Sequence, residues 1–146
     1  MLETGFLLPD PDDADNAPFW AGAAVGELRV QRCSSCGRRR IPPRPMCPAC
    51  RSLENEWEAL SGRGAIWSFV IPHPPLLPAY SELAPYNVIL VALDEDPTLR
   101  LVGNLVASPN GSIGEIDPHT IEIGETVRVV FSEVGDVFLP RWVRAE

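Results

Sequence analysis

Two closely spaced cysteine pairs place the strongest constraint on how this chain of 146 residues can fold. Cys33 and Cys36 form one C-x-x-C motif, Cys47 and Cys50 form a second, and ten residues separate the two motifs. Two such turns can direct four thiolates at one tetrahedral ion. Since four cysteine ligands leave no open position for water or substrate, the spacing predicts a metal ion with a structural role.

The identity of the ion is open between two metals, and zinc is favoured. Iron in a rubredoxin-type site uses the same four-thiolate geometry, and the chain would then be an electron carrier. A redox-active C-x-x-C fits either pair alone but not the paired arrangement. Disulfides are not expected, because the first twenty residues contain five acidic residues and no basic one, unlike a signal peptide. We therefore predict a cytoplasmic protein.

Arginine is concentrated around the cysteines although the chain is acidic. The segment 28–52 contains seven of the twelve arginines and no acidic residue, whereas the formal net charge of the chain is −8. Four thiolates on a divalent ion carry excess negative charge, which Arg32, Arg38, Arg39 and Arg40 could offset. Because seven arginines exceed that need, we expect an exposed basic face that holds phosphate, with a solvated cluster of surface arginines as the alternative. Its candidate residues are Arg40, Arg44 and Arg51.

The segment after the cysteines has the pattern of a small β barrel. Alternating apolar residues and turn signals predict strands within 65–71, 86–94, 99–107, 125–134 and 137–143. Gly103 interrupts the third run, as expected for a bulge or a bend that closes a barrel. Five such runs with almost no helix favour a five-stranded oligonucleotide/oligosaccharide-binding (OB) barrel.

The remaining segments complete the predicted organisation. Residues 15–28, "DNAPFWAGAAVGEL", predict a short helix with a capping residue before it and Gly26 as its stop. The predicted parts are a flexible acidic arm over 1–15, the helix and cysteine module over 16–60, and the barrel with its C-terminal tail over 61–146. The longest apolar run has six residues, far short of the roughly 20 that a membrane helix needs.

The order of these pieces closely resembles a known family. The segments that show the resemblance are "FWAGAAVGELRVQRC", "CSSCGRRRIPPRPMCPAC", "PYNVILVALDE" and "IGETVRVVFSEVGDVFLPRW". Together they resemble the zinc-ribbon/OB-fold family of acyl-CoA-associated proteins over about residues 16–143. The resemblance implies a mainly β fold, with an N-terminal helix and a rubredoxin-like zinc ribbon followed by a five-stranded OB-fold barrel. One departure is "DEDPTLRL", where the family more usually has an acidic-Gly turn.

The resemblance also implies a function as a non-catalytic accessory subunit. Family members bind thiolases, lipid-transfer-protein-type aldolases or hydratases and help to hold an acyl-CoA at the shared interface. Similar proteins in steroid-degrading bacteria pair with an aldolase that shortens a steroid CoA ester. The residues agree, because every cysteine is assigned to metal and neither His73 nor His119 has an acid at a spacing typical of a catalytic pair.

Ligand and partner contacts are predicted on loops and at the C-terminus. His73 is added to the candidate ligand contacts because it opens the Pro-rich segment "HPPLLPAYSELAPY". The partner contacts are aromatic, aliphatic and arginine side chains. They are Phe19, Trp20, Leu76, Leu77, Tyr80, Arg141, Trp142 and Arg144. As alternatives, the Phe19–Trp20 pair packs on the core, and the Pro-rich segment covers one end of the barrel.

Binding of single-stranded nucleic acid is the alternative function from another class. OB barrels and zinc ribbons both bind such ligands through a positive groove with stacking aromatics. Residues 52–146, however, contain fourteen acidic residues and five arginines, so the barrel would repel a polymer of phosphates. We therefore expect no nucleic-acid partner.

Overall fold

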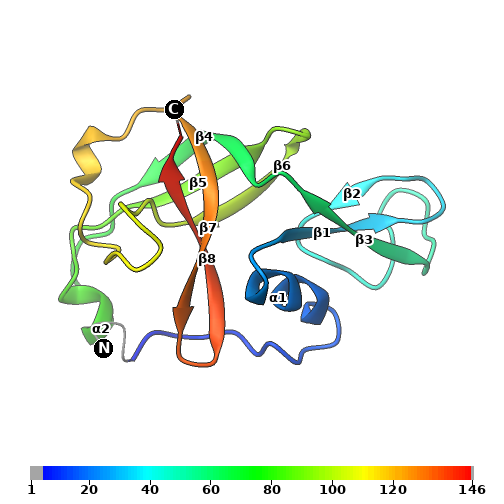
Figure 1. The fold of residues 1–146 in the computed structure, drawn as a ribbon, viewed down its shortest axis with the longest axis horizontal. Helices are drawn as coiled ribbons and strands as arrows, with labels where there is room; N and C mark the ends of the chain where they lie inside the picture. The colour runs from blue at the N-terminus through cyan, green and yellow to red at the C-terminus, as the bar shows by residue number, and fades with distance from the viewer. Residues whose placement is uncertain (1–4, 146) are drawn as a thin grey trace.

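The computed structural model describes residues 5–145, which form two β sheets and three short helices (Figure 1). The first sheet has the strand order β2-β1-β3 and forms the ribbon. Its strands are β1 (Leu28–Cys33), β2 (Arg39–Arg40) and β3 (Asn55–Leu60). The second sheet has the order β6-β5-β4-β7-β8 and is antiparallel throughout. Its strands are β4 (Arg63–Val70), β5 (Val88–Leu93), β6 (Asp96–Gly103), β7 (Thr126–Val134) and β8 (Val137–Arg144).

The helices are short and occupy the connections. The first, α1 (Ala17–Ala24), precedes β1 and is stopped by Gly26, which follows the cap residue Val25 and whose φ of 79° suits glycine. The second, α2 (Pro78–Ser81), lies between β4 and β5, and the 3₁₀ helix η1 (Pro118–Thr120) precedes β7. None of the helices in residues 5–145 has the length and apolarity to cross a membrane.

The second sheet closes into a barrel through the segment that follows β6. Leu105 forms a parallel bridge with Trp142 of β8. The N–H of Trp142 donates to the carbonyl of Asn104 at 2.9 Å, and the N–H of Val106 donates to the carbonyl of Trp142 at 2.8 Å. Since β7 pairs with the other edge of β8, the closing segment completes the barrel at Trp142. The predicted five-stranded OB barrel is confirmed.

Gly103 ends β6 at the point where the chain turns toward β8. A Cβ atom at this position would lie 2.9 Å from the indole ring of Trp142 and 3.1 Å from the carbonyl oxygen of Pro140. A side chain here would therefore push β8 away from the barrel. After Gly103 the chain leaves β5 and pairs with β8 at Leu105, as the predicted closing bend requires, and the close approach of Trp142 explains why glycine occupies this position.

Asn87 holds the closing segment in place from inside the barrel and was not singled out from the sequence. Its side chain is fully buried. The amide Nδ2 donates to the carbonyl of Leu105 at 2.9 Å, and Oδ1 accepts from the N–H of Leu105 at 2.6 Å. One side chain thus satisfies both backbone groups of Leu105, which otherwise would be buried without partners.

Replacing Asn87 with alanine is expected to lower the free energy of unfolding by about 2 kcal/mol, because two buried backbone groups lose their partners. Urea denaturation followed by circular dichroism measures this change. Asn110→Ala, at an exposed loop position, is the control and should change stability by less than about 0.5 kcal/mol. Equal effects of the two substitutions would show that Asn87 does not pin the closing segment.

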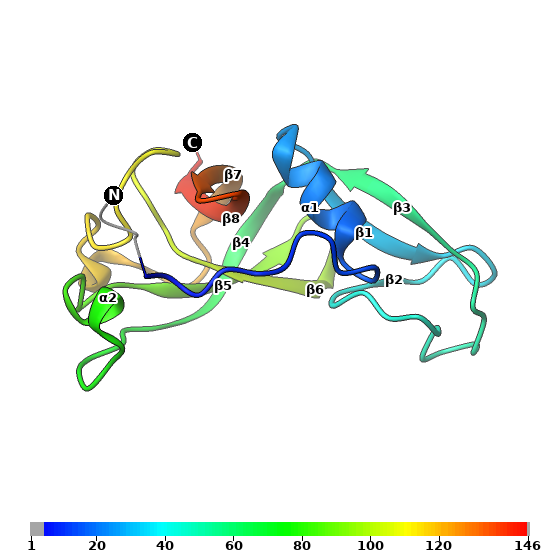
Figure 2. The same ribbon diagram turned by 90° about the horizontal axis from the view of Figure 1, so that it is seen from below.

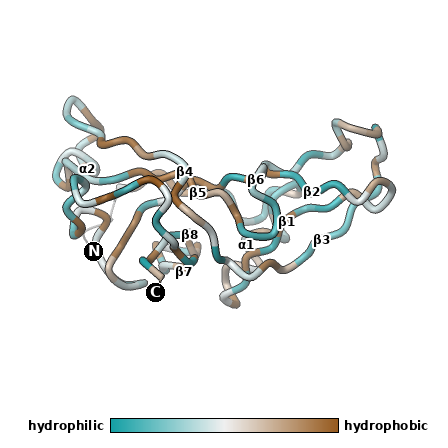
Figure 3. The backbone as a smooth tube through the Cα atoms, turned by 90° about the horizontal axis from the view of Figure 1, so that it is seen from above, coloured by the Kyte–Doolittle hydropathy of each residue, from teal (hydrophilic) through white to brown (hydrophobic). Residues whose placement is uncertain are grey.

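The ribbon and the barrel share one hydrophobic core. Leu28 and Val30 of β1 are buried together with Ile66, Ile89 and Trp142 of the barrel. Phe19 of α1 packs against the same cluster. Figure 3 shows hydrophobic segments running through β4 and β5 at the centre of the molecule. The ribbon is therefore built onto the barrel by continuous packing, with the change of sheet at the turn between β3 and β4.

The N-terminal segment runs along the outside of the molecule from α2 toward α1 (Figure 2). The ring of Phe6 stacks on that of Tyr80 with centroids 4.5 Å apart, and the N–H of Leu7 donates to the Tyr80 hydroxyl at 3.0 Å. Phe6 and Leu7 of the predicted arm thus contact α2, and residues 1–4 lie outside the described part of the chain.

Candidate functional site

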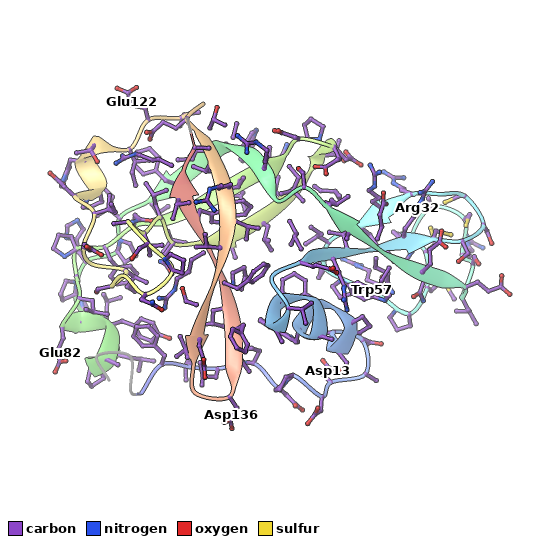
Figure 4. The ribbon with its side chains drawn as sticks, in the orientation of Figure 1. Asp13, Arg32, Trp57, Glu82, Glu122 and Asp136 are labelled. Carbon is purple, nitrogen blue, oxygen red and sulfur yellow. The ribbon has the colours of Figure 1, made fainter. Side chains whose placement is uncertain are left out.

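The four cysteine thiols converge at one point at the end of the ribbon far from the barrel, where Figure 4 shows the sulfur atoms near Arg32. All four Sγ atoms lie within 4.8 Å of one another. Cys33 Sγ is 3.5 Å from Cys50 Sγ, and Cys36 Sγ is 3.7 Å from Cys47 Sγ. Tetrahedral zinc with bonds of about 2.3 Å requires sulfur separations of about 3.8 Å. A disulfide would need about 2.05 Å, so the arrangement fits a metal site.

Two turns of the same form present the thiols. The N–H of Gly37 donates to the carbonyl of Cys33, and the N–H of Arg51 donates to the carbonyl of Cys47, both at 2.9 Å. Gly37 and Arg51 have φ values of 77° and 67°, so both turns close through a left-handed residue. A left-handed backbone is uncommon for arginine, but the geometry of the second turn requires this conformation at Arg51.

The turns also direct backbone N–H groups at sulfur, which favours thiolates. The N–H of Cys36 donates to Cys33 Sγ at 3.4 Å. This bond, with a second from Ser35, lowers the pKa of Cys33 to about 6. The N–H groups of Cys50 and Ala49 lower the pKa of Cys47 in the same way. Cys50 behaves differently: a backbone bond from Ser52 lowers its pKa, but the neighbouring thiols and burial raise it to about 11 overall. The backbone therefore favours the thiolate, the form that binds metal, at Cys33 and Cys47.

The arginines around the cysteines take several different positions. Arg32 Nε donates to the carbonyl of Gly37 at 3.2 Å in the first turn. Arg39 makes a bidentate ion pair with Glu58 at 2.8 and 2.9 Å, which raises the pKa of Arg39 and lowers that of Glu58. Arg40 is buried, which corrects the prediction that it forms part of an exposed face, whereas Arg44 and Arg51 are exposed.

The two histidines lie outside the ribbon. His73 is exposed in the connection between β4 and α2. In Figure 1 this connection lies on the side of the barrel away from the ribbon, so the structure does not bring His73 together with Arg40, Arg44 or Arg51. His119 Nδ1 lies 3.2 Å from Asp117 Oδ1, although the sequence suggested no acidic neighbour for it. Asp117 also accepts from the N–H of His119 at the start of η1, so this contact belongs to an exposed turn.

The predicted partner contacts before residue 81 have mixed exposure. Phe19 packs against the core and meets the ring of Trp20 edge-on, with centroids 4.9 Å apart. Leu76 and Tyr80 pack against a second cluster that contains Tyr86 and covers one end of the barrel. Leu77 has 54% of its surface exposed. Of these residues, Leu77 therefore offers the largest exposed fraction to a partner.

Residues in β8 require a correction. Trp142 is fully buried in the barrel core, and Arg141 is 2% exposed. Successive side chains of a strand point to opposite faces, so Trp142 points into the barrel, whereas Arg141 lies on the other face and donates from Nη1 to the carbonyl of Gly111 at 3.5 Å. The prediction that these two side chains face a partner is therefore wrong for the isolated chain. Arg144 is exposed at the end of β8 and donates to Glu125 at 2.8 Å.

An exposed apolar surface on β4, β5 and β6 was missed from the sequence. Trp67, at the bulge in β4, is 49% exposed, and Arg100 of β6 stacks over its ring at 3.8 Å. Val70 and Val102 are 59% and 55% exposed. Strand pairing aligns Val102 with Leu90 and Val70 with Val88, so these side chains share one face. We call Trp67, Val70, Leu90, Arg100 and Val102 the outer apolar face. Its only sequence signal was the apolar character of β4 on both sides.

A four-cysteine ribbon that precedes a closed five-stranded barrel defines the class of zinc-ribbon/OB-fold proteins. Residues 20–56 match the rubredoxin-like zinc ribbon domain of ChsH2, and residues 57–132 match its C-terminal OB-fold domain. The chain belongs to this ChsH2, or DUF35, family.

Three known proteins illustrate the similarity. A probable enoyl-CoA hydratase alpha subunit of Thermomonospora curvata is 39% identical over 122 residues, which are 83% of this chain and 34% of the relative. The 3-oxo-4,17-pregnadiene-20-carboxyl-CoA hydratase alpha subunit of Mycobacterium tuberculosis is 31% identical over 97% of this chain and 41% of the relative. The chain thus spans less than half of either subunit. A chain of the solved Ltp2-ChsH2(DUF35) aldolase is 34% identical, with a TM-score of 0.78 over 94% of this chain and 100% of that chain.

Proposed function

We propose that this chain is a non-catalytic accessory subunit that binds a thiolase-like enzyme, such as a lipid-transfer-protein-type aldolase, and helps to hold its acyl-CoA substrate. One observation carries the proposal. The chain matches the whole length of a chain in the Ltp2-ChsH2(DUF35) aldolase at 34% identity. The steroid CoA ester named for the mycobacterial relative suggests acyl-CoA derivatives of steroids as the substrate class.

The chemistry of the side chains supports an accessory role. The cysteines are best used as ligands of one zinc ion, which would stabilise the ribbon and take no part in a reaction. His119 is held in a surface turn by Asp117, with 70% of its side chain exposed. We therefore assign the nucleophile and the general base to the partner enzyme.

We assign the outer apolar face to the enzyme subunit. Strands 2 and 3 of an OB barrel commonly form its ligand surface, and they correspond to β5 and β6 here. A nucleic acid would need a basic surface at this place, whereas the face carries Trp67, Val70 and Val102 with one arginine. Strands β4 and β5 contain no acidic residue although the chain has twenty. A surface with tryptophan, arginine and few carboxylates is typical of the centre of a protein interface.

The test is co-expression of the tagged chain with a thiolase-like aldolase from the same genome, followed by affinity purification and an assay with a steroid acyl-CoA. We expect the two chains to purify together, and the enzyme to cleave its substrate only or mainly when the accessory chain is present. Thioester turnover by the purified chain alone would contradict the proposal. Absence of any complex with thiolase-like and hydratase subunits would also contradict it.

Val102→Glu is expected to weaken that complex at least tenfold without unfolding the chain, because a buried unpaired carboxylate in an interface costs more than 1.4 kcal/mol. Surface plasmon resonance against the immobilised enzyme measures the affinity. Ile123→Glu, at an exposed β-branched aliphatic residue outside the face with 66% exposure, is the matched control. Equal losses for both variants would place the interface elsewhere.

A further inference from the structure

A groove of about 350 Å³ lies where the ribbon meets the barrel. One wall comes from β2 and the loop after it, and the other comes from Thr98 and Leu99 of β6. Figures 1 and 2 both place β2 beside the β5–β6 hairpin. Arg39 Nη1 donates to the carbonyl of Glu95 across this junction at 3.4 Å. The remaining lining residues are Arg38, Arg40, Ile41, Pro42, Arg44 and Pro48.

The groove collects more positive charge than the chain neutralises. Four of the residues that line it are arginines, and none of the lining residues is acidic. Glu58 neutralises Arg39 through the bidentate pair. Within residues 5–145, the side chains of Arg38 and Arg44 make no hydrogen bond or ion pair. Both are exposed and can turn toward a ligand.

The burial of Arg40 is a second, independent indication of an anion site. Its residue surface is 6% exposed, yet it lines the groove. Nη2 donates to the carbonyl of Arg44 at 2.9 Å, whereas Nε and Nη1 have no hydrogen-bond partner among the described residues. Gln31, which pairs with Arg40 across β1 and β2, uses its Oε1 to accept from the N–H of Arg44. A buried guanidinium without a carboxylate is unfavourable, and an anion bound in the groove would supply the missing partner.

We propose that this groove binds a phosphate-bearing ligand, with Arg40 as the buried anchor and Arg38 and Arg44 as the closing arginines. A planar guanidinium holds phosphate through paired N–H groups, which the exposed Arg38 and Arg44 offer directly. Nε and Nη1 of Arg40 are covered, so they reach a ligand only after a local movement. On the opposite wall, the hydroxyl of Thr98 already donates to Asp96 Oδ1, at 2.6 Å, so the arginines supply the donors for the ligand. Taken with the proposed function, the ligand is the phosphorylated nucleotide end of the acyl-CoA substrate, and only this last identification depends on that function.

Calorimetric titration of the zinc-loaded full chain tests the site without the enzyme. Adenosine 3′,5′-bisphosphate serves as the probe for the nucleotide end of CoA, inorganic phosphate as the probe for a simple anion site, and pantetheine as the probe without phosphate. We expect the bisphosphate to bind, pantetheine not to bind, and Arg38→Ala/Arg44→Ala to weaken the bisphosphate at least tenfold. Amide NMR shifts should change for residues 38–44 and for Thr98.

Arg128→Ala is the matched control, because it removes one exposed arginine on β7 that does not line the groove. The proposal requires unchanged binding by this variant. Equal weakening by Arg128→Ala, binding of pantetheine, or no binding of either phosphate probe at low salt would overturn it. If inorganic phosphate bound as tightly as the bisphosphate, the groove would still be an anion site, but the identification of a nucleotide as its ligand would be wrong. Because no enzyme is present, these results are independent of whether the chain forms the proposed complex.

Discussion

Cys47→Ser is expected to abolish tight binding of the ribbon metal and to lower the melting temperature by on the order of 10 °C or more. Loss of one thiolate opens the four-sulfur site, and structural zinc contributes several kcal/mol of folding free energy directly. Cys47 is buried, so the serine hydroxyl would also occupy a place shaped for sulfur. Metal content by plasma emission spectroscopy and melting by circular dichroism measure the two effects.

Ser34→Ala is the control for this substitution, because Ser34 is exposed in the same module and its side chain is not a metal ligand. It should retain one ion per chain and melt within a few degrees of the parent protein. Zinc in the purified protein with no visible absorption supports the zinc assignment, whereas strong visible absorption would indicate iron. A chain with unchanged melting after Cys47→Ser would show that the metal does not hold the fold.

Trp142→Ala is expected to lower the free energy of unfolding by about 4 kcal/mol, the range seen when a large buried aromatic side chain is removed. Trp142 is fully buried, lies against Gly103 and shares the core with the ribbon residues Leu28 and Val30. Removing its ring therefore leaves a cavity where the barrel closes. Chemical denaturation gives the difference in stability.

Arg144→Ala provides the comparison in the same strand. Arg144 is exposed and pairs with Glu125, so its removal should cost less than about 1 kcal/mol. If Trp142→Ala instead left stability intact and weakened only partner binding, the side chain would have to face outward in the complex. That result would restore the prediction that Trp142 contacts a partner.

Local patterns were sufficient for much of the architecture. The spacing of the four cysteines predicts one metal site because C-x-x-C turns act within a few residues, and the thiols do meet. Alternating apolar residues predict the barrel strands, and Gly103 predicts the bend after β6. The sequence left residues 95–98 between two predicted strands, but Asp96 already begins β6. A tight turn at Asp94 and Glu95 with an irregular register takes the place of the family's acidic-Gly turn.

The sequence predicts the set of helices and strands, the metal ligands and the excess of arginine beside them, because each of these features depends on residues close together in the chain. Tertiary structure alone decided which arginines are buried, which are paired and which line a groove with β6, since Glu58 and Thr98 come from other strands. Tertiary structure also decided that Trp142 lies in the core and that Trp67 is exposed to solvent. The direction of a side chain on a closed, bulged sheet depends on the register with neighbouring strands, which local periodicity does not specify.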